Sequence, residues 1–294
     1  MTSTVLLDEL MQTHDADPAF TAQQLRLMAE QVVNEADQPR YTWLVNHVIG
    51  ETLGLWQDAY HIQQQAIGQS AQRIVLRNRA VAALLAGFPE EVHQWESQLC
   101  LVTQASSEHV IMVIRLGVLQ HVAPSTSPAV TAHTLAPYLH EMSHWNMSGP
   151  LDDLLGASLN NIVFSLLSHE GLDTTDTEQC QTLVEAAQRS KMFWQHAGGW
   201  LQHQRADYLR ALVFNAIGDW SAAVNAAHSA LATIDAYGPE EVDQAFLLLE
   251  LSRAYRHLGE EQKARNSRDH AFALAKHFDE PRLMECFQKQ AAVN

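Results

Sequence analysis

One spacing recurs through the chain and constrains its fold more than any other feature: a glycine, an alanine five residues later, and a second alanine seven residues after that. Its three full copies are Gly54, Ala59 and Ala66; Gly218, Ala223 and Ala230; and Gly259, Ala264 and Ala271. A looser copy reads Gly87, Val92 and Leu99. Glycine readily adopts the left-handed conformation that ends a helix, and residues seven apart lie on one face of the helix that follows. The spacing therefore predicts pairs of helices that approach closely through small side chains.

Helix signals also fill the chain between these copies. Proline is favoured at the first position of a helix, and five prolines stand where a helix is expected to begin: Pro89, Pro128, Pro150, Pro239 and Pro281. The apolar segment from His109 to Val122 has the composition of either a strand or a buried helix. Its length and the lack of a hairpin partner favour a helix. We expect about fourteen helices with short connections and no sheet.

At these residues the chain resembles the tetratricopeptide repeat family. The family's motif places a glycine at the end of its first helix, an aromatic residue two positions later, and small residues on its second helix. The aromatic residues Trp56 and Trp220 fit that position. Further matches are the residues that precede the glycines: Trp43, Tyr255 and Phe214, and the small residues Ala80, Ala211 and Ser252. The segment Ser158–Gly171 also looks like a first helix of this family.

The chain departs from the family pattern in several places. Successive glycines of the pattern lie 33, 84, 47 and 41 residues apart, rather than at a uniform repeat, and the closing proline is usually missing. Asn46 and Arg210 stand where the family usually has leucine. The resemblance extends over about residues 40–290, and it is good at 200–277 and weak at 101–200.

The resemblance implies an all-α fold, a right-handed α-solenoid of stacked helix-turn-helix pairs, in one domain over residues 1–294. Residues 1–37 would form N-terminal capping helices, 38–277 the repeats, and 278–294 a C-terminal capping helix. Family members generally bind a peptide or protein segment in a concave groove lined by the first helices, without chemistry of their own. The resemblance thus implies a regulatory or adaptor protein that is not an enzyme and needs no metal or cofactor.

Mapping from the glycines predicts which residues face that groove. The peptide-groove residues would be Arg77, Asn161, Arg205, Tyr208, Leu212, Asn215, Leu249, Arg253 and Arg256. Arginine and tyrosine contribute much of the binding energy at interfaces because they bury large areas and form directed hydrogen bonds. The alternative for Arg253 and Arg256 is that they only pair with neighbouring acids on a hydrated surface. The Lys and Asn pattern with which some members grip a chaperone's terminal carboxylate is absent.

Charge and cysteine content narrow the classes of partner and the compartment. The formal net charge of -16 disfavours direct binding to nucleic acid, because the protein's own field repels a polyanion. Three scattered cysteines cannot build a disulfide framework, which favours a reducing, cytoplasmic location. The apolar runs are too short to cross a membrane.

The charge is also unevenly distributed. Residues 116–188 contain eight acids and no lysine or arginine, whereas the tail from Arg253 holds eight basic and six acidic residues. These charges either scatter over hydrated faces, or form an acidic surface that attracts a basic segment of a partner. The opposite signs also permit head-to-tail association of copies into a homo-oligomer.

A second motif supports an alternative function. The segment HEMSH at 140–144 matches the H-E-x-x-H pattern, in which His140 and His144 would bind zinc while Glu141 acts as general base. The motif is short enough to occur by chance in a histidine-rich chain, and Pro137 restricts a helix there. A third interpretation is a small-molecule-sensing domain, with a pocket near Trp194, Trp200 and Trp220.

Overall fold

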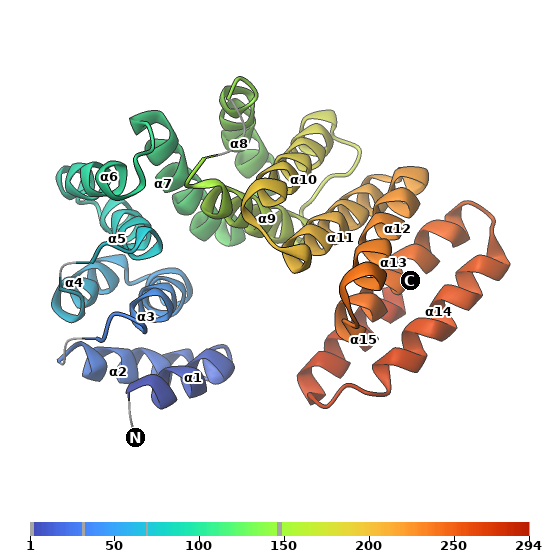
Figure 1. The fold of residues 1–294 in the computed structure, drawn as a ribbon, viewed down its shortest axis with the longest axis horizontal. Helices are drawn as coiled ribbons and strands as arrows, with labels where there is room; N and C mark the ends of the chain where they lie inside the picture. Colours follow the sequence, from blue (N-terminus) through green and yellow to red (C-terminus); the bar gives the residue numbers. More distant parts are fainter. Residues whose placement is uncertain (1–2, 31–32, 69, 146–148, 294) are drawn as a thin grey trace. The chain divides into compact units, whose positions relative to one another are not determined.

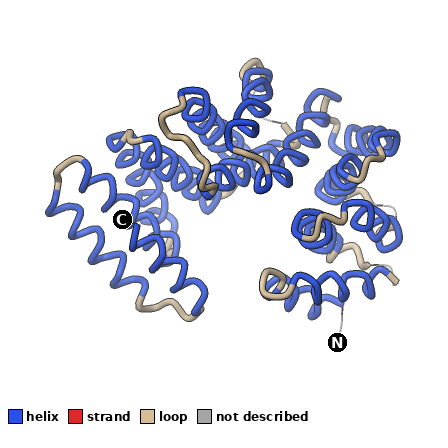
Figure 2. The backbone as a smooth tube through the Cα atoms, turned by 180° about the vertical axis from the view of Figure 1, so that it is seen from behind, coloured by secondary structure: helices blue, strands red, loops and turns tan. Residues whose placement is uncertain are grey.

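The computed structural model describes residues 3–30, 33–68, 70–145 and 149–293. In these ranges the chain is helical, without a strand, as Figure 2 shows. The all-α prediction is therefore confirmed. No helix of the described ranges is both long and apolar enough to cross a bilayer.

The helices, which Figure 1 labels, divide into two compact units by their contacts. The first comprises residues 1–125 and 149–158, and the second residues 126–148 and 159–294. Unit 1 contains α1 (Ser3–Thr13), α2 (Pro18–Ala29), α3 (Gln38–Leu44), the π-helix η1 (Val45–Thr52), α4 (Trp56–Ala66), α5 (Arg73–Leu85), α6 (Pro89–Thr103), α7 (Ser107–Val122) and the 3-10 turn η2 (Ala123–Ser125). Unit 2 contains α8 (Pro128–Met142), α10 (Thr177–Ala197), α11 (Trp200–Ile217), α12 (Trp220–Tyr237), α13 (Glu241–His257), α14 (Glu261–Ala275) and α15 (Pro281–Val293), and α9 (Asp152–Ser168) is shared. The single repeat domain over residues 1–294 stays a prediction.

The predicted glycine turns are present in both units. Gly54, Gly87, Gly218 and Gly259 all have φ between 70° and 83°, in the left-handed region where glycine is favoured. Each lies between two helices that pack as an adjacent pair, such as α11 with α12 and α13 with α14. The repeated glycine therefore marks helix-pair turns, as its spacing predicts.

The small residues of the pattern are buried between the paired helices. All six alanines after the full-pattern glycines expose 3 % or less of their surface: Ala59, Ala66, Ala223, Ala230, Ala264 and Ala271. Val92 and Leu99 of the looser copy are buried as well. The absence of large side chains on these faces lets each second helix lie close against the first.

We expect Gly259→Ala to lower the free energy of unfolding by about 1–2 kcal/mol, because a side chain is strained at φ +76° even though a Cβ there meets nothing within 4 Å. Gly259→Asn is the matched control, since asparagine tolerates this conformation better. Urea denaturation measures both. Equal losses for alanine and asparagine would contradict a purely conformational origin.

Some expected helix starts are confirmed and others are wrong. Helices α6, α8 and α15 begin at Pro89, Pro128 and Pro281. Helices α9 and α13 begin two residues after Pro150 and Pro239, at Asp152 and Glu241, so these two prolines precede the first turn. The segment 109–122 lies in α7 and is largely buried, which confirms the helical interpretation.

One element, the π-helix η1, was not expected. It continues α3 directly. Its main-chain hydrogen bonds join residues five apart, such as the bond from Leu53 N to Val48 O at 3.0 Å. Gly50 in η1 is buried beneath the Trp56 ring, where an added Cβ would lie 2.5 Å from two ring carbons. Since π-helices are rare and occur frequently at functional sites, η1 directs attention to the side chains that it presents.

Candidate functional site

Two of the predicted peptide-groove residues, Arg205 and Asn215 on α11, form hydrogen bonds to α13. Asp243 at the start of α13 accepts bonds from Gln204 and from Arg205, whose Nε lies 2.7 Å from its Oδ2. The Arg205 side chain is 57 % exposed, so this ion pair lies at the edge of the helix contact. Arg205 is thus accessible, but already paired.

A second set of bonds lies deeper between these helices and includes α15. Asn215 Nδ2 donates to Glu250 Oε2 at 2.6 Å and to its main-chain oxygen at 3.0 Å. Gln290 Nε2 donates to Glu250 Oε1 at 2.6 Å and to the Tyr208 hydroxyl at 3.3 Å. Burial is the main cause that raises the pKa of Tyr208, and the nearby negative charge of Glu250 is the second. The Tyr208 hydroxyl therefore stays neutral. We call these four residues the Glu250 network; it joins α11, α13 and α15.

Three predicted groove residues are buried, and their assignment to an open groove needs correction. Asn215 and Leu249 have no exposed surface, and Glu250 beside them is 2 % exposed. Arg77 is 5 % exposed and donates to Asn78, Gln120 and Ser158 within unit 1. Burial lowers the pKa of the Arg77 guanidinium to about 10. These side chains hold helices together and cannot contact a peptide unless the fold opens.

The remaining predicted groove residues keep some access to solvent. Asn161 and Arg256 are exposed, and Tyr208, Leu212 and Arg253 are half-buried. The two arginines lie on α13, so a charged surface remains beside the Glu250 network.

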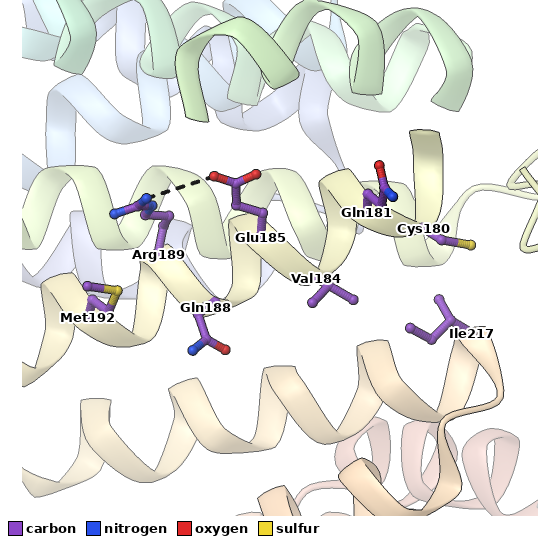
Figure 3. A pocket seen from close by; sticks show the side chains of 8 residues that line it. All are labelled: Cys180, Gln181, Val184, Glu185, Gln188, Arg189, Met192 and Ile217. Atoms are coloured by element: carbon purple, nitrogen blue, oxygen red, sulfur yellow. Dashed lines mark ion pairs between the residues drawn. The ribbon is translucent and has the colours of Figure 1, made fainter. Parts of the chain in front are cut away.

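The structure also contains an open pocket of about 580 Å³ on α10, which the sequence analysis did not single out. Cys180, Val184, Met192 and Ile217 provide its apolar lining, with Ile217 reaching it from the end of α11 (Figure 3). The remaining lining residues are Gln181, Glu185, Gln188 and Arg189. In the sequence this face of α10 shows only a mixture of apolar and polar residues. Helix faces that are buried against neighbouring helices have the same mixture, so the sequence does not distinguish a pocket from a helix contact.

Acidic residues are concentrated in α10 and in the segment just before it, and α10 provides most of the pocket lining. Of the eight acids in residues 116–188, six lie in unit 2: Glu141, Glu170, Asp173, Asp176, Glu178 and Glu185. All but Asp176 are exposed. The nearby cations are already paired, Arg189 with Glu185 at 3.9 Å and Lys191 with Asp207 at 2.6 Å. Within the lining the charges of Glu185 and Arg189 balance, so the excess of negative charge lies at the start of α10, at Asp173, Asp176 and Glu178.

A cluster of polar rings lies in unit 1. His14 and Asp15 are in the turn after α1, His47 is on η1, and Trp43 of α3 stacks on His47 with ring centroids 5.0 Å apart. Glu51 accepts a hydrogen bond from His121 Nδ1 at 2.6 Å. Burial alone would raise the pKa of Glu51, but the bonds from His121 and His47 lower it to about 2, so this carboxyl is ionised.

The HEMSH segment has a different geometry from this cluster. His140 and Glu141 are in the last turn of α8, whereas His144 lies beyond the helix end at Met142. The rings of His140 and His144 are 5.1 Å apart, and all three side chains are exposed. In the described ranges, none of these residues belongs to a group of three ligands close enough to share a metal ion.

Two of the three tryptophans of the suggested small-molecule pocket, Trp200 and Trp220, take part in ring contacts. Trp200 stacks on Tyr237, and Trp220 stacks on His257 with centroids 3.8 Å apart. These contacts give both rings a packing role.

Comparison with known proteins assigns no family. No family model matches this chain, and no curated protein matches it.

Proposed function

We propose that this protein is a peptide-binding helical repeat module of the tetratricopeptide class, with pairs that stack in the right-handed sense within each unit. Its class would make it a cytoplasmic adaptor or regulator without catalytic activity. The observation that carries the proposal is the set of four left-handed glycine turns, each followed by a second helix with buried apolar residues, which are alanines after three of the four glycines. Helix pairs of this kind leave first-helix side chains for recognition.

The α10 pocket is the site that we favour within this module. Its apolar lining accepts an apolar anchor, and the acids in and just before the first turn of α10 attract positive charge. The occupant proposed is therefore a basic, amphipathic segment of a partner protein, which would place its apolar face on Val184 and Ile217. The α11–α13 face is a weaker candidate because several of its polar groups are satisfied internally.

A labelled amphipathic helical peptide with leucine on one face and lysine on the other tests this site. We expect fluorescence anisotropy to show binding that weakens as salt rises, because salt screens the charge attraction. Val184→Lys should weaken binding at least tenfold by placing a cation in the apolar lining. Leu101→Lys is the matched control, because Leu101 is a 72 % exposed leucine in unit 1.

A peptide with glutamate in place of lysine distinguishes binding at the α10 pocket from binding at the α11–α13 face. It should bind at least tenfold more weakly than the basic peptide. Tighter binding of the acidic peptide, lost on Arg253→Glu, would move the site to the α11–α13 face. Equal binding of the basic peptide to the Val184→Lys and Leu101→Lys variants would overturn the α10 assignment.

The zinc-hydrolase alternative has one specific prediction: His144→Ala should abolish both stoichiometric zinc and any hydrolysis. The exposed positions of His140, Glu141 and His144 do not favour it.

A further inference from the structure

Three potential metal ligands converge at the start of unit 1. The turn between α1 and α2 provides His14 and Asp15, and η1 provides His47. One ligand atom from each lies within 4.8 Å of the other two. The Asp15 Oδ1 atom is 3.4 Å from His14 Nε2 and 3.7 Å from His47 Nε2. In the described ranges this is the one group of three such side chains.

The outer ring nitrogens define how the two imidazoles are oriented. His14 Nδ1 lies 2.9 Å from the main-chain oxygen of Met11, and His47 Nδ1 lies 3.5 Å from Glu51 Oε2. Both neighbours are acceptors, so a neutral imidazole that donates from Nδ1 has its lone pair on Nε2, directed at the Asp15 carboxylate. Three electron-pair donors this close need a shared positive charge. That charge is either a proton on an Nε2, which then donates to Asp15, or a metal ion.

We propose that His14, Asp15 and His47 bind a zinc ion. Zinc takes imidazole and carboxylate ligands at about 2.0–2.2 Å in a tetrahedron, so neighbouring ligand atoms should lie about 3.3 Å apart. The two distances from Asp15 Oδ1, 3.4 and 3.7 Å, are close to that value, and the ligand atoms of all three residues lie within 4.8 Å of one another, so binding would draw them inward. Two nitrogens and one oxygen also suit a divalent transition metal better than magnesium or calcium, which prefer oxygen alone.

The groups around the three ligands hold them in position, as the hydrogen-bond partners of metal ligands do in known metal sites. Glu51 and the Met11 carbonyl accept the outer imidazole hydrogens, an arrangement that fixes the tautomer and makes Nε2 a better ligand. His121, which is 3 % exposed, holds Glu51 in place. Trp43 packs against both imidazoles, stacked on His47 and edge-on to His14.

The site is open on one side. The Asp15 side chain is 44 % exposed, and three protein ligands leave a fourth position for water. Bound zinc would link the α1–α2 turn to η1, two segments about thirty residues apart in the chain. The metal would thus fasten the first helices of unit 1 to the π-helix.

Metal titration tests the proposal in a variant that lacks the competing exposed pair, His140→Ala/His144→Ala. We expect this protein to bind one equivalent of cobalt(II) with visible absorption typical of four-coordinate cobalt, and zinc to displace it. Zinc should also raise the melting temperature. Asp15→Asn should weaken zinc binding at least tenfold, and Glu51→Gln about 10–100-fold through the orientation of His47.

Glu9→Gln is the matched control, because Glu9 is an exposed acid on α1 outside the cluster. It should bind zinc like the parent. His47→Ala removes a ligand but also the stacking on Trp43, so circular dichroism must show that this variant is still folded. If it is not folded, Asp15→Asn, a substitution in an exposed turn, tests the site instead. Absence of zinc binding in the parent, or equal binding by the Asp15→Asn and Glu9→Gln variants, would overturn the proposal.

Discussion

Replacing Gly50 by alanine is expected to lower the free energy of unfolding by about 2–3 kcal/mol. The added Cβ would lie 2.5, 2.5 and 2.7 Å from three carbons of the Trp56 ring, distances that packed atoms do not tolerate. Trp56 cannot simply move away, because it packs on the unit 1 core and lies edge-on to His121 at 5.4 Å. Either η1 or the start of α4 must therefore shift.

Gly68→Ala is the matched control for this substitution. Gly68 also lies in unit 1, and a Cβ there meets nothing within 4 Å. Its stability should change by less than about 0.5 kcal/mol. Urea denaturation compares the two variants, and a Gly50→Ala protein as stable as Gly68→Ala would show that Trp56 has room to move.

Asn215→Leu is expected to cost about 3 kcal/mol, because it removes two hydrogen bonds and leaves the buried Glu250 carboxylate with one amide partner. The two side chains are similar in size, so a cavity contributes little. This result would identify Asn215 as a structural residue rather than a peptide contact.

A double-mutant cycle with Glu250→Met tests whether Asn215→Leu loses stability because the buried Glu250 carboxylate is left without the Asn215 amide. Glu250→Met in the Asn215→Leu background should recover a large part of the stability, since an apolar pair of similar volume replaces a polar one. If Asn215→Leu leaves stability unchanged but weakens binding of the acidic peptide, Asn215 belongs to a binding groove after all.

The helix pairs were predictable because their cause is local. A left-handed glycine followed at fixed intervals by alanines describes one turn and one helix face, and each full copy of the pattern spans thirteen residues. The positive φ at Gly218 and the buried Ala223 follow directly from that pattern. The family departure at Asn46 has a tertiary reason instead, since its amide bonds to Asn78 and Gln63, which are 32 and 17 residues away in the chain.

The solvent access of the groove residues was not predictable in the same way. The local sequence around a polar residue such as Asn215 is the same whether its side chain contacts a ligand or a neighbouring helix. The difference depends on Gln290, which lies 75 positions later in the chain and reaches Glu250 from α15. The distance between the partners removes any short-range signal.

The proposed metal ligands were missed for a related reason. His14-Asp15 and His47 have no recognisable spacing, and η1 changes the register of the side chains after Trp43. The HEMSH segment has a recognisable spacing, yet α8 ends between its two histidines. Here a sequence motif and an assembled cluster of ligands do not coincide.

The Glu250 network has a consequence for synthesis of the protein. Glu250 precedes Gln290 by 40 residues, so at roughly 5–20 residues per second the ribosome needs about 2–8 s to add this partner. Until α15 has been made and has docked, the only partners left for the carboxylate are Asn215 and water. Docking of α15 then replaces that water with the Gln290 amide.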